Sequence, residues 1–165
     1  MRRAARRRRS PQAAPAALEL SLRRRVRDWA PSRRELRLWA GTALGRRAAG
    51  SELAIAIVGA PESRRLNAHY RGRNQPTNVL SFPAGLPAGV PLPVLGDLVI
   101  CAPVVAREAL EQHKALEAHW AHLVVHGCLH LLDFDHAYEI EAVEMEALER
   151  SILAGMGYPD PYLAR

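Results

Sequence analysis

The sequence predicts an α+β fold: a single domain in which a small mixed β-sheet packs on helices, with a three-histidine metal site on a long helix and the loop after it. The 165-residue chain has the length of one domain, and its 48% hydrophobic content is sufficient for one core. Short apolar runs and longer segments of helical periodicity follow one another in the order β-α-β-α-β-β-α-α. Three histidines near the end of the longest helical segment have the spacing of metal ligands.

The N-terminal half is expected to contain two strands and two helices. The strands are short apolar runs, at Leu18–Leu22 and Leu53–Val58. Ser32 and Glu35 have the spacing of a capping box, which predicts a helix that begins there and ends near Gly50. A second helix is expected over Glu62–Gly72, because Gly72 is a typical stop signal.

The C-terminal half is expected to contain two strands and then two helices. The strands are predicted at Asn78–Phe82 and Asp97–Cys101. Four prolines and two glycines between them, in Pro83–Pro93, predict a loop. A long helix is expected from Pro103 to about Leu132, and a last helix over Tyr138–Met156.

Both C-terminal helices have a predicted inner face. The apolar stripe of the long helix consists of Trp120, Leu123, Val124, Gly127 and Leu131. A row of histidines lies on the adjoining face. On the last helix, Met145, Leu148 and Ile152 are expected to point inward and many glutamates outward.

The histidines His126, His130 and His136 predict a metal site. The first two are four residues apart, so their rings extend from one face of a helix, one turn apart. The third follows six residues later, which lets the chain leave the helix and fold back. This is the spacing found in metzincin peptidases, in which three histidines hold Zn²⁺ and leave its fourth position open to water. The alternative is a polar helix face without a metal.

Two neighbouring residues limit this interpretation. His122 lies two turns before His130, or about 12 Å along the axis, so it cannot share an ion with both ends of the row. We therefore expect it to contact the ligands or the substrate. Zinc peptidases carry a general-base glutamate directly after the first histidine, where this chain has Gly127. The site is thus expected to be hydrolytic but unsuited to ordinary proteolysis.

The net charge of +6 is concentrated at the N-terminus. Residues 1–9 contain six arginines and no acidic residue, so the remainder is neutral (6 − 6 = 0). We expect residues 1–15 to form a disordered arginine-rich tail that either binds RNA through phosphates or is dispensable. The domain would then comprise residues 16–165.

The cysteines and the apolar segments indicate the compartment. Cys101 and Cys128 lie in apolar segments and are expected to be buried free thiols of a reducing compartment, with Cys128 directed away from the histidines. No apolar run approaches the ~20 residues of a membrane span. We expect a cytoplasmic protein with no membrane partner.

Several stretches together resemble the YbeY family of metal-dependent endoribonucleases. The match extends over roughly Leu18 to Leu163. The stretches are Leu66–Gly72 (LNAHYRG), Thr77–Pro83 (TNVLSFP), Leu95–Ile100 (LGDLVI), the run from His119 to His136, and Gly157–Tyr162 (GYPDPY). They are long and occur in the family's order.

This resemblance implies a single-strand-specific endoribonuclease. It implies action on ribosomal RNA, in maturation of the 3′ end of small-subunit (16S) rRNA and in ribosome quality control, so RNA and the ribosome are the expected partners. It implies one Zn²⁺ per chain held by His126, His130 and His136, and a functional arginine at Arg71. Arg71 could bind phosphate oxygens in a bidentate manner. Without the resemblance it would be a solvated arginine at a helix end.

Other residues are candidates for the surroundings of the metal. Asp97 and Asp135 could accept hydrogen bonds from ligand imidazoles, although Asp97 could equally be a turn residue at a strand end. Asn78 and Ser81 either line the cleft or end a strand. Asp133 replaces the family's usual glycine at a helix end, where we expect a positive φ that aspartate tolerates.

The sequence leaves the nucleophile open between water on the metal and the RNA 2′-hydroxyl. Two other function classes remain. One is a metallopeptidase or other metallohydrolase, against which Gly127 argues. The other is a non-catalytic ribosome-assembly factor with structural zinc, against which a set of three rather than four ligands argues.

Overall fold

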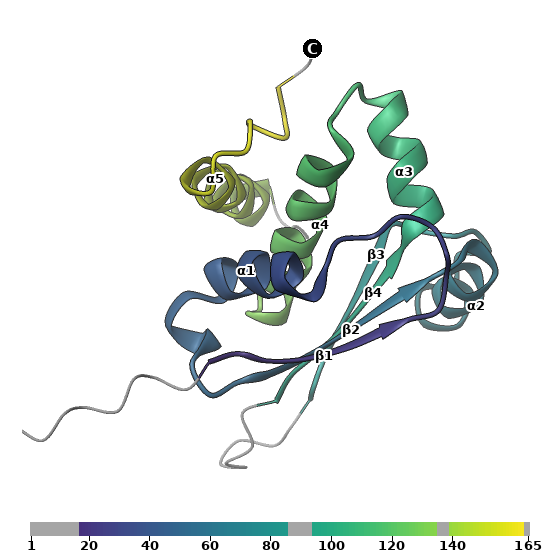
Figure 1. Ribbon diagram of the computed structural model, residues 1–165, viewed down its shortest axis with the longest axis horizontal. Coiled ribbons are helices and arrows are strands. Elements are labelled where there is room, and N and C mark those ends of the chain that lie inside the picture. Colours follow the sequence, from purple (N-terminus) through teal and green to yellow (C-terminus); the bar gives the residue numbers. More distant parts are fainter. Residues whose placement is uncertain (1–16, 86–93, 135–138, 164–165) are drawn as a thin grey trace, which may run out of the picture.

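The computed structural model describes residues 17–85, 94–134 and 139–163, and these residues confirm the predicted α+β fold (Figure 1). The strands are β1 (Glu19–Arg24), β2 (Glu52–Val58), β3 (Val79–Pro83) and β4 (Val94–Cys101). The helices are α1 (Arg33–Leu44), the 3₁₀ turn η1 (Gly45–Ala48), α2 (Ala60–Arg71), α3 (Ala102–Glu111), α4 (Leu116–Leu131) and α5 (Glu139–Gly155).

The four strands form one mixed sheet in the order β1-β2-β4-β3. β1, β2 and β4 are parallel, whereas β3 runs antiparallel to β4 at the edge. Side chains alternate between the two faces of a strand. In β4, Leu98 and Ile100 are fully buried in the main core. Asp97 precedes Leu98, points to the other face and is exposed.

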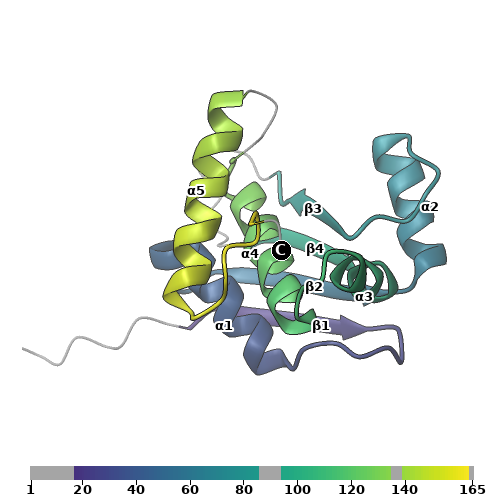
Figure 2. The same ribbon diagram turned by 90° about the horizontal axis from the view of Figure 1, so that it is seen from above.

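Helix α4 is the central element of the core. It packs against β3 and β4 and is flanked by α1, α3 and α5 (Figures 1 and 2). The whole predicted apolar stripe of this helix is buried, and so are Ala121, Val125, Cys128 and Leu129 on its other sides. Beyond its exposed first turn, α4 is partly accessible only along a narrow strip, and that strip carries His122, His126 and His130.

Helix α1 begins as the sequence predicts. Ser32 Oγ accepts a hydrogen bond from the Glu35 backbone N–H at 3.3 Å, and the Ser32 N–H donates to the Glu35 carboxylate at 2.7 Å. This reciprocal capping box satisfies two backbone donors of the first turn and lowers the pKa of Glu35. The α-helix ends at Leu44 rather than near Gly50, because the chain continues as the 3₁₀ turn η1.

The prediction of one helix from Pro103 to Leu132 is wrong. The chain leaves the helix after Glu111 and restarts at Leu116. His113 turns the chain with a left-handed φ of 53°, and the Lys114 N–H closes the turn on Ala109 O at 2.9 Å. The linker has no glycine or proline to indicate a stop, so local sequence gave no signal. A tertiary hydrogen bond from Lys114 Nζ to Pro161 O at 2.6 Å helps to fix the break.

The structure also tests the predictions about the cysteines, Asp133 and membrane spans. Cys101 and Cys128 are buried and free, as expected, and burial raises the pKa of Cys128 to about 12. Asp133 has the predicted positive φ, at 67°. Among the described helices, none has both the length and the apolarity to cross a bilayer. The tail at residues 1–15, Asp135, His136 and most of the Pro83–Pro93 loop lie outside the described residues.

Candidate metal centre

Gly127 brings the histidine-bearing helix onto the sheet. A Cβ at this position would lie 2.9 Å from Leu98 Cδ2 and 3.3 Å from Ser81 Oγ. Ser81 Oγ donates to the Gly127 carbonyl at 3.3 Å, which joins β3 to the middle of α4. Position 127 therefore faces the sheet, where a glutamate side chain has no room. The general base of a zinc peptidase cannot occupy this position in this packing.

His126 and His130 lie side by side on the accessible strip of α4. Their Nε2 atoms are 3.1 Å apart, and the rings meet edge to face with centroids 4.6 Å apart. Two imidazole nitrogens that bind one Zn²⁺ tetrahedrally at about 2.0–2.1 Å lie about 3.4 Å apart. The spacing of these two nitrogens thus fits two ligands of one ion.

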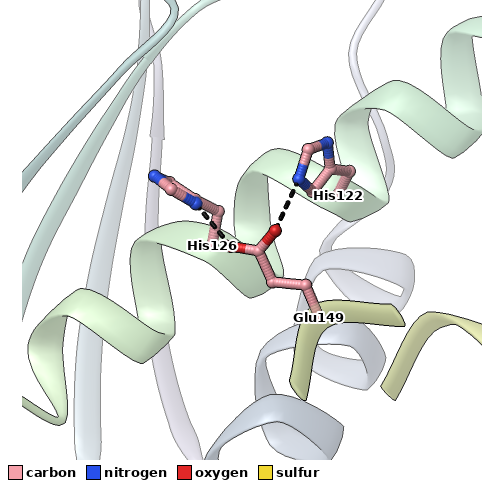
Figure 3. A group of neighbouring side chains, drawn as sticks. All are labelled: His122, His126 and Glu149. Atoms are coloured by element: carbon pink, nitrogen blue, oxygen red, sulfur yellow. Dashed lines mark hydrogen bonds and ion pairs between the residues drawn. The ribbon is translucent and has the colours of Figure 1, made fainter. Parts of the chain in front are cut away.

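A buried glutamate from α5 completes a second cluster. The Glu149 carboxylate lies between His126 and His122 and uses one oxygen for each (Figure 3). The His126 Nδ1–Oε1 distance is 2.5 Å and the His122 Nε2–Oε2 distance is 2.9 Å. The Tyr162 hydroxyl donates to Oε2 as well. Ligand atoms of His122, His126 and Glu149 all lie within 4.8 Å of one another, so this group could also hold a metal ion.

The charges of this cluster follow from its contacts. Burial would raise the pKa of Glu149, but hydrogen bonds from His122, His126 and Tyr162 outweigh it and lower that pKa to about 2. Burial lowers the pKa of His122 despite the opposing Glu149 carboxylate. Burial and the same carboxylate raise the pKa of Tyr162. The cluster therefore contains one carboxylate anion surrounded by donors.

A pocket of about 640 Å³ opens beside the histidines. It brings together five residues predicted from the sequence, although they come from three separate parts of the chain. They are Arg71, Asn78, Ser81, His126 and His130. Asp133 and Phe134, which follow α4, also line it. Arg71 ends α2, where Gly72 takes the left-handed conformation (φ 68°) that closes the helix.

The Asn78 side chain is held rather than free to turn. Its Nδ2 lies 3.1 and 3.2 Å from the two Glu108 oxygens, and its Oδ1 accepts from the Val79 N–H at 2.6 Å. Glu108 in turn lies 2.8 Å from Nε2 of buried His119. Asn78 and His126 also line an adjoining hollow of about 420 Å³, which His122, His119 and Tyr162 share.

Among the described residues, the candidate Asp97 does not line this pocket. Asp97 lines hollows on the opposite face of the sheet, one of them with Tyr70 and Phe82. There it lies in the register position opposite Phe82, away from α4. His136 and Asp135 fall outside the described residues.

Sequence reasoning missed Glu149 and Glu108. Many glutamates of the last helix are exposed or partly exposed, as expected, but Glu149 is an exception because it is fully buried. A signal was present: Glu149 lies four residues from both Met145 and Leu153, which are buried on the same face of α5. A carboxylate within an apolar stripe indicates a specific partner.

Comparisons with known proteins show which family this chain resembles. The family model described as Endoribonuclease YbeY matches residues 31–157. A protein named Endoribonuclease YbeY from Pseudomonas entomophila (strain L48) is 58% identical over 146 residues, which cover 88% of this chain and 93% of the relative. The protein of the same name from Pseudomonas putida (strain W619) is 56% identical over the same shares. A solution structure of a Thermotoga maritima protein has the same fold, with a TM-score of 0.53 and 19% identity over 87% of this chain and 99% of that one.

Proposed function

This chain belongs to the YbeY family of endoribonucleases, and we propose that it is a zinc-dependent, single-strand-specific enzyme that cleaves ribosomal RNA in the cytoplasm. Its proposed tasks are maturation of the 3′ end of 16S rRNA and ribosome quality control. The observation that carries the proposal is the pocket that places the facing imidazoles of His126 and His130 together with the guanidinium-bearing Arg71.

We place the ion at His126, His130 and His136. The 3.1 Å spacing of the first two Nε2 atoms supports this set. Both of these histidines line the open pocket, whereas Glu149 is fully buried and His122 lies outside that pocket. An ion at the alternative His122, His126 and Glu149 group would face the adjoining hollow, which Arg71 does not line. When bound, the ion supplies Lewis-acid stabilisation of charge and an activated nucleophile.

The protein's own residues would bind and orient the RNA. Arg71 can donate two parallel hydrogen bonds to phosphate oxygens, and these bonds strengthen as negative charge develops on the phosphorus substituents. The Ser81 hydroxyl and the Asn78 amide form the wall beside α4, and both are held by hydrogen bonds. A fixed wall confines a single strand in one register, which favours reaction at one position.

A cleavage assay tests this function. We expect the purified protein to cleave a single-stranded RNA oligonucleotide but not the same sequence in a duplex. A chelator should abolish cleavage and added Zn²⁺ should restore it. His126→Ala should be inactive under all conditions. Cleavage that persists in the chelator, or in His126→Ala, would contradict the proposed site.

The assignment to 16S rRNA requires a test in cells. Mapping of 16S 3′ ends should show unprocessed ends in cells that lack the protein. The wild-type protein should restore the mature end, and His126→Ala should not. If the protein acts only in assembly, without cleavage, the wild-type protein and His126→Ala should restore the mature end equally well.

A further inference from the structure

Glu149 is a buried anion that needs an explanation. Its side chain is fully buried although it belongs to the largely exposed, acidic helix α5. Transfer of a carboxylate from water into a protein interior costs several kcal/mol unless donors replace the lost water. Three donors do so here, from His122, His126 and Tyr162. The structure therefore keeps this charge at one point beside the proposed ligand His126.

The carboxylate determines which nitrogen of His126 carries the proton. An ionised carboxylate only accepts hydrogen bonds, and a neutral imidazole has one N–H and one lone pair. Because Nδ1 of His126 faces Glu149 Oε1 at 2.5 Å, that nitrogen is the donor. The lone pair is then on Nε2, on the far side of the ring from Glu149 (Figure 3) and 3.1 Å from His130 Nε2.

The same argument separates His122 from the ligands. Its Nε2 donates to Glu149 Oε2 at 2.9 Å, so its lone pair is on Nδ1. That Nδ1 is buried and has no hydrogen-bond partner among the described residues. A metal at the His122, His126 and Glu149 group would require both rings to give up the N–H donors that compensate the buried carboxylate.

The segment after α5 holds the other side of the carboxylate. Tyr162 donates its hydroxyl to Glu149, and its ring meets His122 edge to face with centroids 5.4 Å apart. The Tyr162 backbone N–H donates to Asp160 Oδ1 at 2.8 Å, and the Arg150 guanidinium lies 5.0 Å from the tyrosine ring centroid. These contacts fix the hydroxyl from the C-terminal segment.

We propose that Glu149 is a positioning residue of the metal centre: it accepts the Nδ1 proton of His126 and thereby directs the Nε2 lone pair of that ring toward the ion, with Tyr162 holding the carboxylate in place. This inference rests on the proposed three-histidine site. Hydrogen bonds of this kind from ligand imidazoles to carboxylates fix the tautomer and raise ligand basicity.

The matched variants are Glu149→Gln and Glu144→Gln, which make the same change on the same helix. Glu144 is exposed. A glutamine at position 149 keeps the shape but presents an NH₂ group to one of the histidine donors. Loss of such a partner weakens metal binding by about 10- to 100-fold. We expect a loss in this range for Glu149→Gln, a smaller loss for Tyr162→Phe, and none for Glu144→Gln.

Two measurements on the full chain test the proposal. The Zn²⁺ Kd is measured by competition with a chromophoric chelator, at a temperature where circular dichroism shows the metal-free variant to be folded. The His126 tautomer is read from long-range ¹H–¹⁵N correlation spectra of the metal-free protein. We expect the Nδ1–H form in wild type and Glu144→Gln, and a loss of this preference in Glu149→Gln.

The opposite results would overturn the inference. It fails if His126 of the wild-type protein is in the Nε2–H form, or if Glu149→Gln and Tyr162→Phe both bind Zn²⁺ as tightly as wild type. It also fails if Glu149→Gln binds no ion while His130→Ala binds one, because Glu149 would then be a ligand. Wild-type protein that binds Zn²⁺ through this tautomer but cleaves no RNA would overturn the proposed function alone.

Discussion

Gly127 is the residue that relates the packing of this protein to its chemistry most closely. Its missing side chain lets α4 approach Leu98 and Ser81, and this approach places His126 and His130 beside the β3 edge. The sequence showed that a peptidase base is absent at this position. The structure adds that the position points into the sheet, so the absence follows from the fold.

The Gly127→Ala substitution should destabilise the protein. The new Cβ would lie 2.9 Å from Leu98 Cδ2, and overpacking of this kind typically costs about 1–3 kcal/mol. Urea titration, which gives the free energy of unfolding of each protein, measures this loss of stability. Gly41→Ala in α1 is the control, because nothing lies within 4 Å of its added Cβ, and it should stabilise by about 0.5–1 kcal/mol. Equal effects of the two substitutions would contradict the packing argument.

Arg71→Ala should leave metal content and folding unchanged but reduce RNA cleavage by about 100-fold or more, the scale seen when one donor to a developing charge is removed. Arg71→Lys should recover part of the activity, because lysine keeps the positive charge but lacks the two parallel N–H donors of the guanidinium group. Arg65→Ala on the same helix is the control, since its side chain is exposed and does not line the pocket. Cleavage rates at saturating RNA measure these effects. An Arg71→Ala variant that cleaves at the wild-type rate would show that Arg71 is only a surface residue.

At the scale of the elements, predictability follows from how local each signal is. The two residues of the capping box, Ser32 and Glu35, are three positions apart, and the two histidines His126 and His130 are four apart. The geometry of one helix therefore determines how the members of each pair lie. The Glu149–His126 contact joins positions 23 residues apart on different helices. It depends on how α5 packs on α4, which no local pattern specifies. The break between α3 and α4 was missed for the same reason, because tertiary contacts of Glu108 and Lys114 hold it.

The end of α4 offers a prediction at this scale. Asp133 has a left-handed φ of 67°, a conformation that costs residues other than glycine roughly 1 kcal/mol. Asp133→Gly should therefore raise the free energy of unfolding by up to about 1 kcal/mol, whereas Asp133→Ala should lower it. Urea titrations of the three proteins give the order. A glycine variant no more stable than the alanine variant would show that the backbone there differs from this description.

At the scale of the whole molecule, composition and element order were enough for the α+β fold, but they did not give the sheet order. That order, β1-β2-β4-β3, places β3 at the edge next to α4. It brings Asn78 and Ser81 to the histidines, whereas the alternation of side chains along β4 leaves Asp97 on the opposite face. From the sequence alone, Asp97, Asn78 and Ser81 were all candidates for the site, because no single segment encodes which strands lie side by side.

The arginine-rich tail gives a prediction for the full chain. Removal of residues 1–15 should leave metal content and cleavage of a short RNA nearly unchanged, since every site residue lies beyond them. Six arginine–phosphate contacts would steepen the slope of log K against log salt by at most about 4, at about 0.7 per contact with single strands. RNA titrations of both forms at several salt concentrations measure the difference. Identical slopes would show that the tail does not bind RNA.

The central claim is that one ion lies at His126, His130 and His136, and serves RNA cleavage. The most direct test is the metal content per chain, by elemental analysis, of wild type, His130→Ala and His122→Ala, with RNA cleavage measured on the same samples. We predict one Zn²⁺ and full cleavage in wild type, loss of both in His130→Ala, and a retained ion in His122→Ala. A His130→Ala protein that keeps its ion, with the ion lost from His122→Ala, would place the metal at His122, His126 and Glu149 and contradict the account.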